Sequence, residues 1–324
     1  MQLLDDYSDK IPIIAVICIF LLIQVLSLYI APYYQDTGIK AFEDPTSILN
    51  ALYFVVIMIF ATVIILLLSR YNMKWVIHGL LIFSIFLTLY IGFDTFIIGF
   101  IVEPIPSALL HTVSLILSVF LTVILFKFKR WYIINFVGVI LAVTISVLFG
   151  VSLIPIVSLI LLLLLAIYDY ISVYKTKHMI TLADDLIDYN LPLLLIIPKK
   201  KDFSMDEMEK INQSQDISRL ESDDTDELSN LDNENGKNSE RYTKKDRKTL
   251  MIGLGDMIIP TIFVVSSNVY IGLFPAIGSM IGGTIGLFLL LRDIGNSKPK
   301  AGLPLLNGGV ILGFLITLLL INII

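Results

Sequence analysis

Two aspartates lie inside apolar stretches of this chain, where an ionised side chain is costly. Asp169 follows an aliphatic stretch, and Asp256 follows two glycines. A charge near the centre of a bilayer costs at least about 2.5 kcal/mol, so an aspartate there indicates a function. Two carboxyls in contact cannot both ionise readily, because repulsion and desolvation favour a proton on one of them. The pair therefore predicts acid–base chemistry, with one carboxylate as general base and its partner as general acid.

The composition is that of an integral membrane protein. Hydrophobic residues make up 56% of the 324 residues and charged residues 16%, whereas charged residues are about 25% of a soluble domain. The single cysteine, Cys18, cannot form an internal disulfide. His78, His111 and His178 are scattered and lack the spacing that places two zinc ligands on one helix face. We expect neither a metal nor a cofactor.

Nine apolar runs are long enough to cross a membrane. About 20 apolar residues in a helix span a hydrocarbon core of about 30 Å. The nine runs are residues 11–31, 48–69, 75–93, 107–126, 131–149, 152–174, 250–268, 270–291 and 303–323. We predict an all-α fold of nine transmembrane helices. Apolar character continues beyond Asp94 to Val102, so the third helix is either longer or bent at Gly92.

The distribution of Lys and Arg predicts the orientation, because cytoplasmic loops retain positive charge. With nine spans, Lys40 is the only Lys or Arg outside the side that holds the N-terminus and the even-numbered loops. We predict a cytoplasmic N-terminus and an external C-terminus. The first run has no small-residue cleavage site behind it, so we interpret it as a retained span.

Residues 199–248 interrupt the apolar pattern with acidic clusters and few aromatic or β-branched residues, a composition typical of disorder. We divide the chain into a six-span bundle at residues 1–174, a cytoplasmic loop at 175–249 that is largely disordered from about 199 to 248, and a three-span bundle at 250–324. A solvated tether is the simpler interpretation of the loop. A regulatory or cleavable loop is the alternative.

Two shorter patterns predict local structure. Leu193 to Ile197 is an aliphatic run between two prolines, too short to span a membrane and suited to a strand; Thr249 to Ile252 is a second candidate for an extended substrate-binding edge. Glycines at a four-residue spacing predict close helix packing. They are Gly278, Gly282 and Gly286, and we interpret Gly308, Gly309 and Gly313 in the same way.

The chain resembles the presenilin and signal peptide peptidase family of intramembrane aspartic proteases, most closely a microbial presenilin-like homologue. Tyr168-Asp169, Gly253-Leu254-Gly255-Asp256 and Leu303-Pro304-Leu305-Leu306 are similar to the YD, GxGD and PAL motifs of that family. The resemblance covers the whole nine-span arrangement, with the motifs in the sixth, seventh and ninth spans. It implies that Asp169 and Asp256 are the catalytic pair of an endopeptidase that cleaves transmembrane helices or signal peptides.

The third motif departs from the family pattern because Leu305 replaces its alanine. In relatives this segment lines the active site, so Leu305 affects the expected size of the pocket more than the chemistry. Pro304 is equally an ordinary first-turn residue of a helix. The full set of substrate-positioning candidates combines these residues with the neighbours of the aspartates: Tyr168, Gly253, Leu254, Gly255, Pro304, Leu305 and Leu306.

The resemblance also bears on partners and location. Presenilins require partner subunits and signal peptide peptidases do not. The short tails and the lack of a docking domain favour an enzyme without obligate partner subunits. We expect single-span membrane proteins or signal peptides as substrates, a multi-pass location in a lipid bilayer, which is the cell membrane in a microbe, and no nucleic acid.

Three alternatives are weighed against the protease. A proton- or cation-coupled transporter or channel would use Asp169 and Asp256 as coupling sites, although no inverted repeat relates the two halves. In the second alternative, a structural or assembly protein, Asp169 and Asp256 would only hold transmembrane helices together. A rhomboid-like protease would need a serine, for which Ser279 lacks a histidine partner. Asp94 has no evident partner, and we interpret it as lying in an aqueous end region, with His111 as a polar packing residue.

Overall fold

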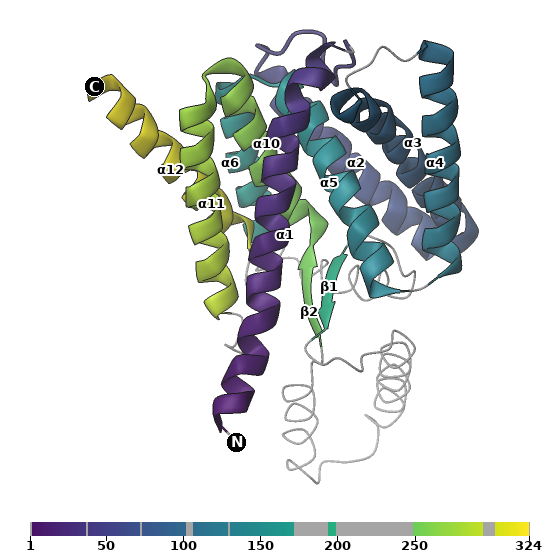
Figure 1. The fold of residues 1–324 in the computed structure, drawn as a ribbon, viewed down its shortest axis with the longest axis horizontal. Helices are drawn as coiled ribbons and strands as arrows, with labels where there is room; N and C mark the ends of the chain where they lie inside the picture. Colours follow the sequence, from purple (N-terminus) through teal and green to yellow (C-terminus); the bar gives the residue numbers. More distant parts are fainter. Residues whose placement is uncertain are drawn as a thin grey trace.

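The computed structural model describes residues 2–36, 38–71, 73–101, 106–128, 130–171, 194–198, 249–293 and 302–323. Within these ranges the chain forms nine helices and one two-stranded sheet (Figure 1). The helices are α1 (Gln2–Asp36), α2 (Leu49–Arg70), α3 (Lys74–Phe100), α4 (Ser107–Lys127), α5 (Trp131–Ser152), α6 (Pro155–Ile171), α10 (Leu254–Tyr270), α11 (Leu273–Asp293) and α12 (Leu303–Ile323), and the strands are β1 (Leu194–Pro198) and β2 (Thr249–Gly253). The predicted disordered segment at 199–248 lies outside the described residues.

Each of the nine predicted runs corresponds to a helix, and the mostly apolar surface of the bundle confirms a multi-pass membrane protein. Six of the described helices are long and apolar enough to cross a membrane by themselves. The other three apolar stretches are shorter: Leu49–Ile65, Pro155–Ile171 and Leu254–Tyr270. The third helix is the longer of the two alternatives, since α3 continues through Asp94 to Phe100. The two helices that carry Asp169 and Asp256 are both among the short ones.

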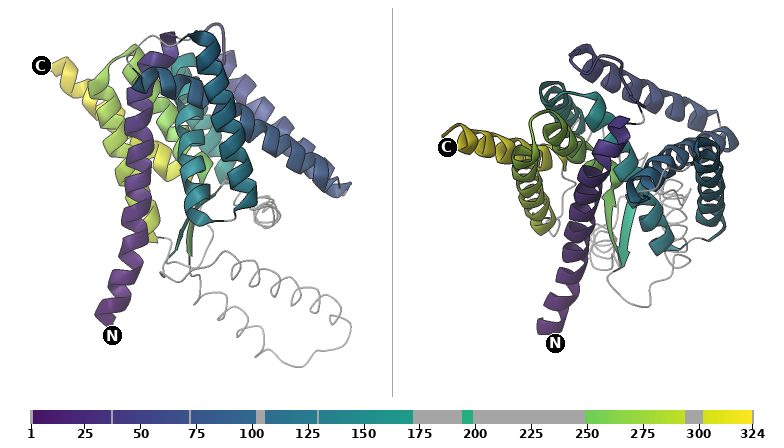
Figure 2. Two further views of the ribbon diagram at one scale, coloured as in Figure 1. Left: turned by 45° about the vertical axis from the view of Figure 1, so that its right-hand side comes forward. Right: turned by 45° about the horizontal axis from the view of Figure 1, so that its top comes forward.

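Helix α10 is the centre of the bundle. It contacts α1, α5, α6, α11 and α12, and both views of Figure 2 show the green helices α10 and α11 next to the purple α1. Its middle, from Thr261 to Ser267, is completely buried. Gly150 of α5 allows a close crossing, because a Cβ there would lie 2.6 Å from Val265. The hydroxyl of Tyr270 donates to the carbonyl of Val151 at 2.6 Å and fixes the far end of the same contact.

The predicted glycine face joins α11 to α12. A Cβ on Gly282 would overlap the carbonyl oxygen of Gly309, and one on Gly278 would overlap Thr317 and the Gly313 carbonyl. The two backbones therefore touch directly, as small residues allow. Gly308 does not take part, contrary to the prediction, since a Cβ there meets nothing within 4 Å.

The two strands form an antiparallel pair in which Ile196 lies opposite Met251 and Ile197 opposite Leu250. Leu195, Ile196 and Ile197 are buried, so the aliphatic run packs into the bundle as well as into the sheet. The predicted helix start at residue 250 is wrong, because residues 250–253 belong to β2 and α10 begins at Leu254. An apolar run has the same composition in both states, and only the pairing with β1 selects the strand.

Candidate active site

Asp256 lies in the first turn of α10, directly after β2. Gly253 is the N-cap residue in an extended conformation, which makes Asp256 the third residue of the helix. The first N–H groups of a helix have no partner within it and carry a partial positive charge, which stabilises a nearby carboxylate. The helix that positions Asp256 therefore also favours its charge in an apolar environment.

Asp169 lies near the end of α6, two residues before Ile171. Its carboxyl group is buried and accepts a hydrogen bond from the backbone N–H of Leu303 at 3.2 Å. Leu303 is the first residue of α12. Asp169 is thus placed at the N-terminus of another helix, so both aspartates have a helix dipole directed at them.

Gly302 brings the two aspartates to one place. A Cβ on Gly302 would lie 3.6 Å from Oδ2 of Asp256, and the next residue, Leu303, donates to Asp169. Helices α6, α10 and α12 contact one another around this point. Asn307, one turn further along α12, donates to the carbonyl of Leu162 at 3.0 Å and holds α12 on α6. This geometry agrees with the expectation that the two aspartates act as a pair.

Pro260 weakens the turn of α10 that carries Asp256. It lies inside the helix, four residues after Asp256. Proline has no N–H, so the carbonyl of Asp256 receives no hydrogen bond from the position that would normally supply one. The backbone at Asp256 therefore keeps an acceptor for another donor.

The predicted positioning residues differ in how they relate to the carboxyls. Gly253 adjoins Asp256, since a Cβ there would lie 3.4 Å from Oδ2, whereas a Cβ on Gly255 would meet nothing within 4 Å. Leu254 and Leu306 are buried in the core, and Leu305 is 42% exposed. Tyr168 and Pro304 are partly buried. Gly302, which adjoins Asp256, was not predicted, although it directly precedes the third motif.

Among the described residues, the hairpin before α10 has one edge without a hydrogen-bonded partner. In β1, the N–H and the carbonyl of Ile196 both bond the side chain of Asn135, a residue of α5, at 2.9 and 2.8 Å. Both backbone groups of one strand residue point to the same side, so Ile196 and its partner Met251 form a pair without hydrogen bonds between them. The N–H and carbonyl of Met251 therefore point away from β1. Sequence reasoning missed Asn135, although a primary amide in an apolar run was a signal.

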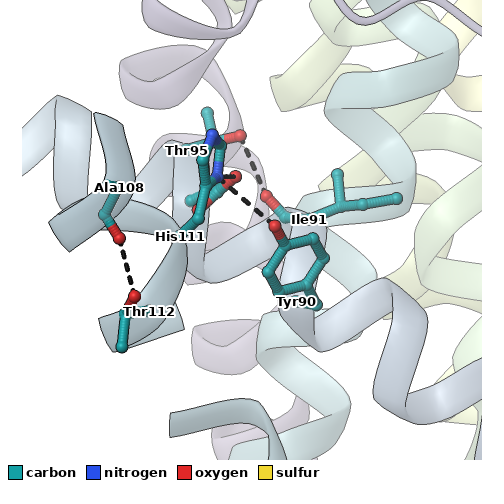
Figure 3. Close-up of polar contacts among 7 residues, drawn as sticks. Tyr90, Ile91, Thr95, Ala108, His111 and Thr112 are labelled. Carbon is teal, nitrogen blue, oxygen red and sulfur yellow. Dashed lines mark hydrogen bonds and ion pairs between the residues drawn. The ribbon is translucent and has the colours of Figure 1, made fainter. Parts of the chain in front are cut away.

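Asp94 has a partner, contrary to the sequence interpretation. His111 of α4 approaches Asp94 of α3, with Nδ1 2.8 Å from Oδ2, and the hydroxyl of Tyr90 lies 3.3 Å from the same nitrogen (Figure 3). Asp94 is 7% exposed, so it is buried rather than in an aqueous end region. Spacing along the sequence could not reveal this pair, which depends on how α3 packs on α4. Within the described part of the chain, no three His, Cys, Asp or Glu side chains gather as a metal site would require.

Comparison with known proteins gives a consistent result. A family model for signal-peptide peptidase, presenilin aspartyl protease matches residues 17–323. Two solved structures of a presenilin family intramembrane aspartate protease are similar. The one in space group C222 has 28% identity and a TM-score of 0.65, covering 95% of this chain and 99% of that chain. The one in space group P2 has 29% identity and a TM-score of 0.64, covering 95% and 98%.

A search of curated proteins finds no match. The family model and the two structures support a protease over the transporter that the buried acidic pair also allowed. The chain therefore belongs to the signal peptide peptidase and presenilin family, and it is an intramembrane aspartic protease.

Proposed function

We propose that Asp169 and Asp256 are the catalytic pair of this protease. The observation that carries the proposal is the shared environment at Gly302 and Leu303, which adjoins one carboxyl and hydrogen-bonds the other. Both carboxyls also face a helix N-terminus: Asp256 lies in the first turn of α10, and Asp169, near the end of α6, faces the first residue of α12. A buried acid without a function would be expected to find a side-chain partner, as Asp94 does in His111 at 2.8 Å.

The chemistry follows from one proton shared by two carboxyls. The ionised aspartate takes a proton from a water molecule as its oxygen attacks the carbonyl carbon of the peptide bond. The protonated partner gives its proton to the carbonyl oxygen, which yields a tetrahedral diol. Collapse of the diol breaks the C–N bond: the carboxyl that gained a proton passes it to the departing amine, while the other carboxylate takes a proton from one hydroxyl of the diol, so the pair again shares one proton. Soluble aspartic proteases use the same pairing.

The substrate is a transmembrane helix, of a single-span membrane protein or a signal peptide, that unwinds beside Asp256. The outward N–H and carbonyl of Met251 offer the hydrogen bonds of an added strand. The open space at Gly255 and the small Gly253 leave room for its backbone. Leu305, at 42% exposure, is a bulky residue two positions after the Leu303 N–H that bonds Asp169, and we expect it to favour small substrate residues near the site.

The positive charges of the even-numbered loops support a nine-span topology with the N-terminus and the 175–249 loop in the cytoplasm. In Figure 1 the start of α1 and the β1–β2 hairpin lie at the same end of the bundle, which fits this arrangement. The hairpin and the aspartates would then face the cytoplasmic half of the cell membrane. The three helices that carry the motifs, α6, α10 and α12, contact one another within one chain, which supports an enzyme without obligate partner subunits.

The test is cleavage of a single-span helical substrate by the purified protein in lipid vesicles. Asp169→Ala and Asp256→Ala should each lower the rate by about 10²–10⁴-fold or more, the contribution of a general acid or base. Asp94→Asn is the matched control, because it alters another buried carboxyl of the bundle outside the site. Cleavage that persists in both alanine variants would refute the assignment. Proton-coupled uptake that needs both aspartates, without cleavage, would favour a transporter.

A further inference from the structure

Asn135 makes an unusual pair of contacts for a side chain in an apolar helix. It is 8% exposed, and its amide bonds both backbone groups of Ile196, which is 4% exposed. A primary amide carries the same donor and acceptor as a peptide group. Asn135 therefore takes the place that one residue of a neighbouring strand would occupy at the outer edge of β1.

The consequence concerns which edge of the hairpin can accept another strand. A two-stranded sheet has two outer edges with unpaired backbone groups. On β1 the residues whose backbone groups point outward include Ile196 and Pro198. Both backbone groups of Ile196 are hydrogen-bonded to Asn135, and Pro198 has no N–H to donate. On β2 the outward-facing groups of Met251 are not used by β1. Within the part of the chain that the structure describes, the hairpin thus has an occupied edge on β1 and an unoccupied edge on β2, and β2 leads directly into α10 and Asp256.

Closing β1 matters because the two edges are not equivalent for catalysis. A substrate strand on β2 lies beside the segment that continues into Asp256. A substrate strand on β1 would lie on the other side of the sheet edge, with β1 between it and β2. It would therefore be farther from β2 by one more strand spacing, about 4.8 Å. The contact of Asn135 also holds the hairpin against α5, since β1 packs on that helix. Without it, the position of β2 relative to the carboxyls is less defined.

We propose that Asn135 is a positioning residue that closes the edge of β1 and fixes the place of β2, so that it decides which peptide bond of the substrate reaches the catalytic pair. The proposal rests on the function proposed above. It assigns to α5 a part in cleavage-site selection, although α5 carries none of the three motifs.

The experiment compares product ends by mass spectrometry for one single-span substrate in vesicles. Asn135→Leu keeps the volume of the side chain and removes both hydrogen bonds. Cleavage should spread from the principal bond to neighbouring bonds, with the ratio of secondary to principal products rising about tenfold, which corresponds to the loss of a typical buried hydrogen bond or two. Asn135→Asp keeps the size and one acceptor for the N–H of Ile196, and should give a smaller spread in the same direction.

Thr144→Val is the matched control, because Thr144 is another buried polar residue of α5 whose hydroxyl bonds only its own helix, at the carbonyl of Ile140. It should leave the product ratio unchanged. Hydrogen exchange at the Ile196 amide should become faster in Asn135→Leu, while the Ile197 amide, which faces β2, keeps its protection. This measurement needs no activity.

The outcomes separate the two proposals. If Asn135→Leu yields the same product ratio as the wild type and only a lower rate, the role in site selection is refuted while the catalytic pair stands. Unchanged exchange at Ile196 would refute it as well. If the alanine variants of Asp169 and Asp256 still cleave, the function itself is wrong, whatever the product pattern of the Asn135 variants.

Discussion

Gly286→Ala should lower the cleavage activity by displacing the start of α12, although the added methyl group contacts neither aspartate. A Cβ on Gly286 would lie 2.9 Å from the carbonyl oxygen of Leu305 and 3.2 Å from Cα of Leu306. Ordinary contact begins at 3.4 Å, so the start of α12 must move by about half an ångström. The Leu303 N–H to Asp169 distance of 3.2 Å would then approach the length at which a hydrogen bond is lost.

The expected loss follows from that displacement. A hydrogen bond to a charged group contributes about 1.5–3 kcal/mol, so kcat/KM should fall by about 10- to 150-fold. The measurement is cleavage of a single-span substrate together with the thermal unfolding temperature. Gly308→Ala is the control on α12, because its Cβ meets nothing within 4 Å. It should retain activity and gain about 0.5–1 kcal/mol of stability from higher helix propensity.

Two results would refute this reasoning. Wild-type kcat/KM in Gly286→Ala would mean that the close contact of α11 with α12 does not position the catalytic groups. Equal losses in Gly286→Ala and Gly308→Ala would mean that any added methyl group on these helices is harmful, whatever it touches.

Three further predictions concern other parts of the chain. Gly255→Ala should raise stability by about 0.5–1 kcal/mol in thermal unfolding and lower cleavage, since the methyl group fills the space proposed for substrate; a gain in both would contradict this. Asp94→Asn should lower the free energy of unfolding by about 1 kcal/mol, through the weakened contact with His111, and leave kcat/KM per folded molecule unchanged. Thr46 donates its hydroxyl and its N–H to Asp44, which holds the pKa of that exposed carboxyl below its usual value. The contact stabilises the fold at pH values above the pKa that Asp44 has in the unfolded chain, and this stability is lost as the pH falls through the lower pKa of Asp44 in the folded protein. Thr46→Val should therefore raise the pKa of Asp44 in an NMR titration. An unchanged pKa would contradict the contact.

The sequence indicates the apolar helices and the two aspartates proposed as catalytic because both depend on the same free energy, that of transferring side chains into lipid. An apolar run of sufficient length forms a helix wherever it packs, and a carboxyl within one is conspicuous. The glycine spacing on α11 was informative for the same reason, since close packing of two helices requires small residues at a helical repeat.

What the sequence could not show depends on tertiary contacts. The extended character of the runs at Leu193–Ile197 and Thr249–Ile252 was predicted, but their pairing with each other was not, because some fifty residues separate the two strands along the chain. The partner of Asp94 and the contact of Asn135 with Ile196 need the relative rotation of neighbouring elements. The sequence also did not show that Gly309, and not its neighbour Gly308, faces α11. Adjacent residues of a helix point about 100° apart, and the spacing of the glycines alone does not show which of the two points toward the neighbouring helix.

The most direct measurement compares binding and cleavage of one single-span substrate by Asp256→Asn and Asp169→Asn, which keep the shape of each side chain and remove its proton transfer. If Asp169 and Asp256 carry out the hydrolysis, both variants should bind the substrate with an affinity close to that of the wild type and produce no cleavage. Cleavage by either variant at a rate near that of the wild type would contradict the claim that these two carboxyls carry out the hydrolysis.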